Sequence, residues 1–95
     1  MGVFIDEPRP TGFKNYTLTV HLISDQGRTE LMRFGAELGM KERWLHNPGT
    51  PKEHFDLFDE WIGLAMMEGA RKISRERFFG IIERKREGSH PRGES

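Results

Sequence analysis

The most regular alternation of hydrophobic and polar side chains lies between residues 17 and 24. Successive side chains of a strand point to opposite sides, so Leu18, Val20 and Leu22 would line one face. Thr19 and His21 would then line the other face. The pattern therefore predicts a strand over residues 17–24 that buries one side against a core.

Shorter apolar runs predict the remaining strands. Val3, Phe4 and Ile5 are strong β-formers, and the prolines at positions 8 and 10 end that run. We therefore expect a strand over residues 2–6 and a loop over residues 7–16. A brief strand is also predicted at residues 72–74. Residues 43–46 are ambiguous but could form another strand, and residues 54–57 form either a short strand or an extended entry to the next helix. A loop rich in proline and glycine is expected at 47–51.

A helical spacing of apolar side chains appears first at Leu31, Phe34 and Leu38. It predicts a helix over residues 26–38. Asp25 is placed to cap the start of this helix, because its carboxylate can accept an unpaired backbone N–H. Gly39 stands where a left-handed C-cap is expected.

Two further helices are expected nearer the end of the chain. The apolar stripe of the first begins at Phe58, with Asp59 as a cap and Gly69 as a stop signal. Ser74 would cap the second, which runs over residues 75–86. Gly80 weakens that helix by up to about 1 kcal/mol relative to alanine.

The order of these elements favours an α/β fold, or α+β, in which about three helices pack on a small mixed sheet of short strands. A chain of 95 residues fits one domain, which we place at residues 1–87. Residues 88–95 contain no apolar side chain and are expected to form a disordered tail.

Composition narrows the classes of function. The chain has no cysteine, which excludes disulfide bonds, thiolate metal sites and a cysteine nucleophile. No apolar run approaches the roughly 20 residues that span a bilayer, and no signal-peptide pattern opens the chain. We therefore expect a soluble, cytoplasmic protein without a membrane partner.

Charge is balanced overall but unevenly distributed. The 15 basic and 15 acidic side chains give a formal net charge of zero, so duplex nucleic acid is not an expected partner. Residues 1–70 carry a net charge of −4, and residues 71–92 a net charge of +5. The basic segment suits an acidic partner surface or a neighbouring subunit, as in a homodimer.

Histidines recur among the predicted extended segments. Residues two apart on a strand point the same way, so His54 would share a face with Asp56, and Trp44 with His46. Together with His21, these segments would direct imidazole rings and one carboxylate toward a common point. The sequence contains no serine–histidine–acid arrangement, phosphate-binding loop or zinc-binding helix motif.

One interpretation of these residues is a divalent metal site. Neutral imidazoles and a carboxylate, at His21, His54 and Asp56, suit Zn²⁺ or another borderline divalent ion, with His46 as a third imidazole. Such an ion would support hydrolysis of phosphoesters. Asp6 would then be a further ligand or a base.

A second interpretation is a pocket for a small phosphate-bearing ligand such as a nucleotide. Trp44 would stack on a planar group, while arginine and histidine side chains would meet the phosphate. A chain this short has limited concavity, and a homodimer interface would add enclosure. The ligand-binding set would be Arg9, His21, Arg43, Trp44, His54 and Asp56.

A third interpretation is a protein-interaction module without a ligand. The histidines would then be solvated or hydrogen-bonded residues on the polar face of the sheet. Trp61 and Met67 would contact the partner, together with the basic third helix. The sequence favours the ligand pocket over the interaction module, and both over the metal-dependent hydrolase. The pocket and the hydrolase both require His21, Trp44 and His54 to line a shared hollow, whereas the interaction module does not.

An ordered set of short motifs carries a resemblance to a known family. The motifs are the strand ending in two acids at residues 3–7, the strand at 20–25, the Arg43-Trp44 pair, and residues 54–57. Over residues 3–75 this set is similar to a family of bacteria and phages catalogued as domain of unknown function 4031. The resemblance implies a compact α/β unit and a bacterial or phage origin, but no activity.

The same resemblance singles out individual positions. His46 departs from the family pattern, where glutamine or another residue is common, so the resemblance weighs against His46 as a metal ligand. The polar and aromatic positions that match the family are Asp6, Arg9, His21, Asp25, Trp44, His54 and Asp56.

Overall fold

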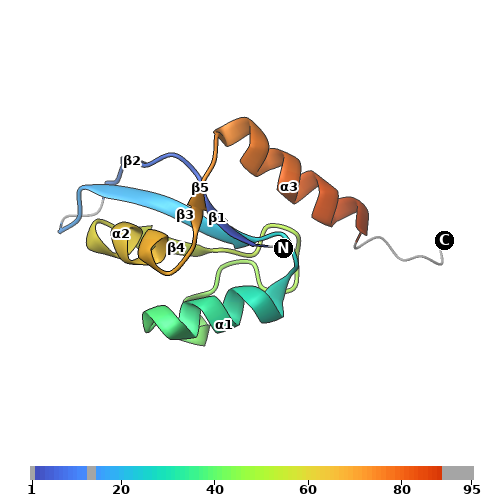
Figure 1. The fold of residues 1–95 in the computed structure, drawn as a ribbon, viewed down its shortest axis with the longest axis horizontal. Coiled ribbons are helices and arrows are strands. Elements are labelled where there is room, and N and C mark those ends of the chain that lie inside the picture. Colours follow the sequence, from blue (N-terminus) through green and yellow to red (C-terminus); the bar gives the residue numbers. More distant parts are fainter. Residues whose placement is uncertain (1, 13–14, 89–95) are drawn as a thin grey trace.

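The computed structural model describes residues 2–12 and 15–88 of the chain. Its elements, in chain order, are β1 (Val3–Ile5), β2 (Arg9–Pro10), β3 (Leu18–Ser24), α1 (Arg28–Leu38), the short 3₁₀ helix η1 (Glu42–Trp44), β4 (Phe55–Phe58), α2 (Glu60–Met67), β5 (Arg71–Lys72) and α3 (Arg75–Gly88). In Figure 1 the sheet lies between α3 on one side and α1 on the other. The expected α/β fold, with three helices on a small mixed sheet, is confirmed.

β3 is the central strand of the sheet. β1 and β2 pair with one of its edges and β4 with the other edge, all antiparallel. β5 runs parallel to β1 and adds the outermost strand on that side. Among the described residues, no helix is both long enough and apolar enough to cross a lipid bilayer.

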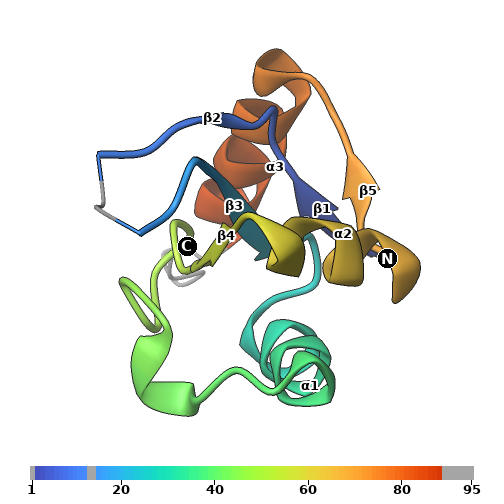
Figure 2. The same ribbon diagram turned by 90° about the vertical axis from the view of Figure 1, so that its left-hand side faces the viewer.

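The two faces of the sheet are covered unequally, as Figure 2 shows with α3 above the sheet and α1 below it. On the lower face, Leu22 belongs to the main apolar core together with Leu31 from α1 and Ile62 from α2. On the upper face, a smaller cluster joins Ile23 to Phe78 from α3. Because this smaller cluster covers only part of the upper face, the polar side chains beside it stay accessible.

One extra residue interrupts the pairing along the first edge of β3. From residue 5 to residue 9 the chain advances four positions, while its partners on β3 advance three, from residue 22 to residue 19. An excess of one residue is a β-bulge, which leaves a backbone group of the partner strand unpaired. Asp6 lies in this bulge, and its carboxylate Oδ1 accepts the backbone N–H of His21 at 2.8 Å.

The sequence correctly placed β3 and β4 but not the segments beside them. β2 lies within the region expected to be a loop. The strand expected at residues 43–46 is wrong, because η1 occupies most of that segment and only His46 pairs, in an isolated bridge with His54. The tight turn buries Leu45 in the main core and leaves Trp44 41% exposed, so Trp44 and His46 do not share a strand face.

α1 begins two residues later than expected, and Asp25 does not cap it. Gly27 occupies the N-cap at φ 125°, and no side chain bonds to the first turn. Ser24 Oγ instead accepts two backbone N–H groups of the preceding turn, and Asp25 accepts the N–H of Gly2 at 2.7 Å. The left-handed C-cap at Gly39 is confirmed, with φ 91°.

The second helix also starts differently from the prediction. Phe58 ends β4 and is not part of the helix. Asp59 stands at the N-cap position, but its carboxylate accepts the N–H groups of Thr17 (3.0 Å) and Leu18 (2.8 Å) across the loop. The Asp59 side chain therefore binds the start of β3 and the residue before it, and it does not cap α2.

The third helix begins as predicted. Ser74 Oγ accepts the N–H of Arg77 at 3.2 Å and caps α3. The helix extends to Gly88, so the expectation of a disordered tail is wrong at that residue. The rest of the predicted tail, residues 89–95, lies outside the described residues.

Candidate functional site

The register of β3 and β4 places three metal-ligand types on the upper face. His21 lies directly opposite Asp56, so their side chains are neighbours. His54 stands two residues before Asp56 and points the same way, as the sequence predicted. One ligand atom from each of these three residues lies within 4.8 Å of the others, an arrangement that could hold a metal ion.

Asp56 is the shared acceptor of this cluster. Its Oδ1 lies 3.4 Å from Nε2 of His54 and 3.9 Å from Nε2 of His21. Its Oδ2 lies 3.1 Å from Nε2 of His46, whose ring stacks on that of His54 with centroids 5.0 Å apart. The carboxylate therefore has imidazole nitrogens on both oxygens.

The bulge residue Asp6 fixes the orientation of His21. Burial alone would raise the pKa of Asp6, but hydrogen bonds from the His21 side chain and backbone, with the charges of His21 and Arg9, hold that pKa below its usual value. The ionised carboxylate can only accept, so Asp6 Oδ2, 2.8 Å from His21 Nδ1, favours the tautomer that carries the hydrogen on Nδ1. In the neutral ring, Nε2 is then left with its lone pair.

A backbone carbonyl fixes the orientation of the His54 ring. Its Nδ1 lies 2.8 Å from the carbonyl oxygen of Lys52, which can only accept, so Nδ1 donates there. Both histidines thus have an acceptor oxygen 2.8 Å from Nδ1 and turn Nε2 toward Asp56. Metal-ligating histidines almost always have such a second hydrogen bond, which fixes the tautomer and the ring orientation.

Without a metal, His54 and Asp56 pair whenever His54 is protonated, since Nε2 and Oδ1 lie 3.4 Å apart. Burial lowers the pKa of His54, but the bonds to Asp56 and to the Lys52 carbonyl, with the charges of Asp56 and Asp6, outweigh it and raise that pKa. The hydrogen bond from His54 lowers the pKa of Asp56 against the opposing effect of burial. A metal ion at this position would replace the proton on His54 Nε2.

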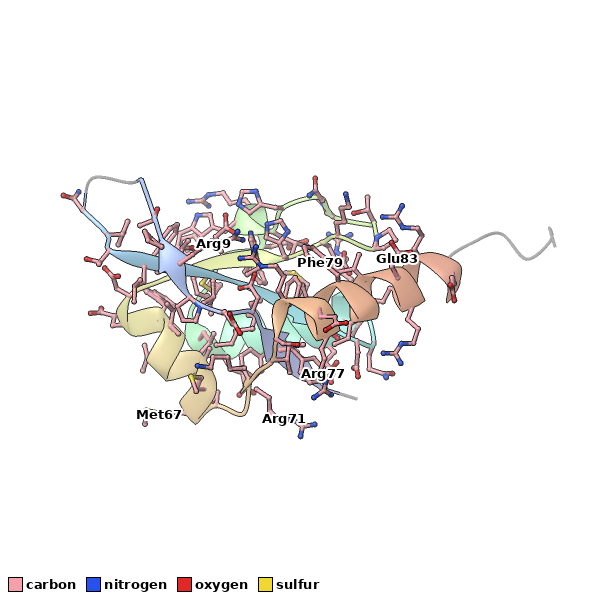
Figure 3. All side chains as sticks on the ribbon, turned by 90° about the horizontal axis from the view of Figure 1, so that it is seen from above. Arg9, Met67, Arg71, Arg77, Phe79 and Glu83 are labelled. Atoms are coloured by element: carbon pink, nitrogen blue, oxygen red, sulfur yellow. The ribbon has the colours of Figure 1, made fainter. Side chains whose placement is uncertain are left out.

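Arg9 stands at the edge of the cluster. Its Nη2 lies 3.6 Å from Asp6 Oδ2 and 2.8 Å from His21 Nδ1. A guanidinium can only donate, so the contact of Arg9 with Nδ1 favours the opposite tautomer and competes with Asp6 for that nitrogen. A hollow of about 400 Å³ lies between these residues and α3, and both Arg9 and Phe79, labelled in Figure 3, line it. Lys52, Arg75 and Arg86 add positive charge to its lining, beside Glu83.

A second pocket, of about 550 Å³, adjoins the cluster at the outer edge of β4. It shares Asp56 and His46 with the cluster. Tyr16 and Phe58 stack in it with ring centroids 4.7 Å apart. We call this hollow the aromatic pocket; it is lined by Tyr16, Met40, Arg43, Trp44, Leu45, His46, Asp56, Phe58 and Trp61.

The structure divides the sequence-predicted residues between these two places. His21, His54 and Asp56 come together, with Arg9 beside them. Arg43 and Trp44 do not join them but lie in the aromatic pocket. The ligand-binding role of both groups remains a prediction.

The residues expected to contact a partner lie in different surroundings. Trp61, expected at a partner surface, packs against the main core and lines the aromatic pocket. Met67 is 83% exposed on α2. The Lys52 carbonyl was not predicted from the sequence, because a backbone group cannot be recognised from the type of side chain. Tyr16 and Phe58 were also missed, and for them the aromatic side chain was the only indication of a pocket.

The fold and the cluster together define a small α/β protein with an accessible histidine–aspartate site on one face of its sheet. Comparison by sequence then places the chain within a family. It matches the family described as "Protein of unknown function (DUF4031)" over residues 3–85, and it belongs to that family. No curated protein and no solved structure matches the chain.

Proposed function

We propose that the protein is a metal-dependent phosphoester hydrolase that acts on small phosphate-bearing molecules with a planar ring, such as nucleotides. The orientation of His21 and His54, each with Nδ1 2.8 Å from an acceptor oxygen and Nε2 turned toward Asp56, carries this proposal. Three protein ligands leave coordination positions open for water and substrate, as catalytic metal sites require.

The ligand set defines the class of metal. Two imidazole nitrogens and a carboxylate oxygen suit Zn²⁺, Mn²⁺ or Fe²⁺ better than the all-oxygen sites that Mg²⁺ and Ca²⁺ prefer. An ion of this class activates a bound water and neutralises charge on the phosphate. Asp6 supports the site by favouring the His21 tautomer that ligation needs.

The surroundings orient the substrate. Arg9, fixed by its pairing with Asp6, faces the hollow beside the cluster and would hold a phosphate oxygen. The aromatic pocket begins at Asp56, so a ring attached to that phosphate would lie against Trp44. Stacking of a base on an aromatic side chain contributes about 1–3 kcal/mol.

His46 is positioned to move a proton. Its Nε2, 3.1 Å from Asp56 Oδ2, lies where the metal cluster meets the aromatic pocket. In hydrolysis a P–O bond forms to water, the P–O bond to the leaving group breaks, and a proton reaches the leaving oxygen to give an alcohol. His46 would deliver that proton as general acid.

Steady-state hydrolysis by the zinc- or manganese-loaded protein tests the proposal, with a nucleoside monophosphate and glycerol phosphate as substrates. Asp56→Asn should abolish turnover of both substrates. Trp44→Ala should raise KM for the nucleotide about tenfold and leave glycerol phosphate unchanged, because only the nucleotide has a ring to stack. Wild-type rates in Asp56→Asn, or in protein stripped of metal, would contradict the proposal.

A second candidate function is binding of the same ligand without hydrolysis. The aromatic pocket favours it, because stacking of a ring against Trp44 and Tyr16 needs no metal. Nucleotides should then raise the unfolding temperature of metal-free protein, since a ligand of the folded state stabilises it. An unchanged unfolding temperature at millimolar nucleotide would exclude this candidate.

A further inference from the structure

The flank of α3 that faces away from the histidine–aspartate cluster borders another hollow. Figure 3 shows Phe79 and Glu83 on one flank of the helix and Arg77, with Arg71 nearby, on the other. This hollow has a volume of about 940 Å³. α3, the turn before α1 and residues 49–53 enclose it, and we call it the polyanion pocket.

Positive charge converges on the polyanion pocket from three separate parts of the chain. Its acids, Asp25 and Glu53, are both already engaged, since each accepts a backbone N–H, at 2.7 Å and 3.0 Å. Five cations line the pocket against these two acids, and one of them, Arg28, also lies 3.4 Å from Glu42, which is not part of the lining. The five cations are Arg28 from α1, Arg71 from β5, and Arg77, Arg84 and Lys85 from α3.

Lys85 has an ammonium group that the fold leaves without a hydrogen-bond partner. Its Nζ is buried, and among the described residues it is the one buried side-chain nitrogen or oxygen that lacks a hydrogen bond. Burial lowers the pKa of Lys85, while the charges of Glu53 and Asp25 oppose that shift. A buried ammonium without a hydrogen bond is costly, and an anionic ligand in this wall would supply the missing acceptor.

We propose that the polyanion pocket binds a small molecule that carries two or more linked phosphate groups. The volume falls within the range of small-ligand sites. The cations line one hollow and come from three elements of the fold, which favours a compact polyanion over an extended nucleic-acid backbone. This site is separate from the candidate metal centre and does not depend on the function proposed for it.

Isothermal titration of the metal-free, full-length chain with inorganic tripolyphosphate tests this proposal. One equivalent should bind, with an affinity that falls as salt rises. Lys85→Met should weaken binding about tenfold, the loss expected for a charge-assisted hydrogen bond. The same variant should unfold at a higher temperature, because it removes the unpaired buried charge, whereas loss of a purely structural lysine would lower that temperature.

Two further variants sharpen the test. Arg84→Gln, at an exposed position of the pocket, should also weaken binding. Lys72→Met removes an exposed lysine of β5 that does not line the pocket, and should leave binding unchanged. Amide resonances of Gly27 and Gly49, which line the pocket, should shift on titration.

Several results would overturn the proposal. These are no binding of tripolyphosphate at millimolar concentration, unchanged affinity in Lys85→Met, and resonance shifts at Arg9 and His54 in place of Gly27 and Gly49. Binding of a single-stranded oligonucleotide without binding of tripolyphosphate would overturn it too, since it would identify a different class of ligand.

Discussion

A single extra residue in the first edge of the sheet determines how His21 is presented. Regular pairing would give the His21 N–H a main-chain partner, whereas the bulge gives it the Asp6 carboxylate. The same carboxylate then holds Nδ1 of the ring. The sequence indicated Asp6 as a strand-end acid, but its role depends on a register between segments 15 residues apart, which local pattern does not encode.

Asp6→Asn tests this role in metal binding. The amide oxygen can still accept the His21 N–H, but its NH₂ group cannot accept from Nδ1–H, so the ring loses the support for its ligating tautomer. We expect zinc affinity, measured by competition with a chromophoric chelator, to fall about 10- to 100-fold. Glu7→Gln, the neighbouring exposed acid, is the control and should bind zinc normally. Equal zinc affinities in the two variants would refute the role of Asp6.

The ion pair between His54 and Asp56 predicts how metal-free protein responds to pH. A histidine whose pKa rises on folding stabilises the fold below its unfolded value of 6.5, and this stabilisation is lost as pH rises through the folded value. An aspartate whose pKa falls on folding stabilises above 3.8, and this is lost as pH falls. The pair should therefore contribute most between pH 3.8 and 6.5.

Thermal unfolding of chelator-treated protein at a series of pH values measures this contribution. The unfolding temperature should decline as pH rises above 6.5, and His54→Gln should show a smaller decline. An identical pH dependence in wild type and variant would mean that the pair does not form in solution.

Among the elements, those whose secondary structure is determined by their own residues were predicted best, and those that depend on pairing with another strand were missed. β3 was predicted closely because its alternation is carried by its own side chains. β2 was missed because Arg9 and Pro10 have no strand pattern and pair only through β3. Residues 43–46 resemble a strand in sequence because Trp44 and Leu45 form a short apolar run there. In the structure the 3₁₀ helix η1 places Leu45 in the core instead.

Two glycines of the helices should respond oppositely to alanine. A Cβ on Gly35 would lie 2.7 Å from the ring of Phe55, so Gly35 permits the close approach of α1 to the sheet. Gly35→Ala should destabilise by about 1–3 kcal/mol through overpacking. A Cβ on Gly80 would meet nothing within 4 Å, so Gly80→Ala should stabilise α3 by up to about 1 kcal/mol.

Urea denaturation of the two variants measures both effects. Because both changes add the same methyl group within a helix, each variant is the control for the other. Destabilisation of similar size in both variants would contradict the account, because it would mean that the contact with Phe55 does not distinguish Gly35 from Gly80.

For the whole molecule, the position of α3 divides the upper face. The helix covers the small apolar cluster around Ile23 and leaves the histidine–aspartate cluster open beside it. Its basic residues, which the sequence presents as one positive segment, face two different hollows. Composition revealed the charge, but only the packing of α3 on the sheet shows where each cation points.

X-ray anomalous scattering at the zinc edge, from crystals grown with Zn²⁺, tests the central claim most directly. We predict one strong peak about 2.0–2.2 Å from Nε2 of His21, Nε2 of His54 and a carboxylate oxygen of Asp56. Such a peak should vanish in crystals of Asp56→Asn. A map without a peak among these three residues, although zinc is present in the crystal, would contradict the account.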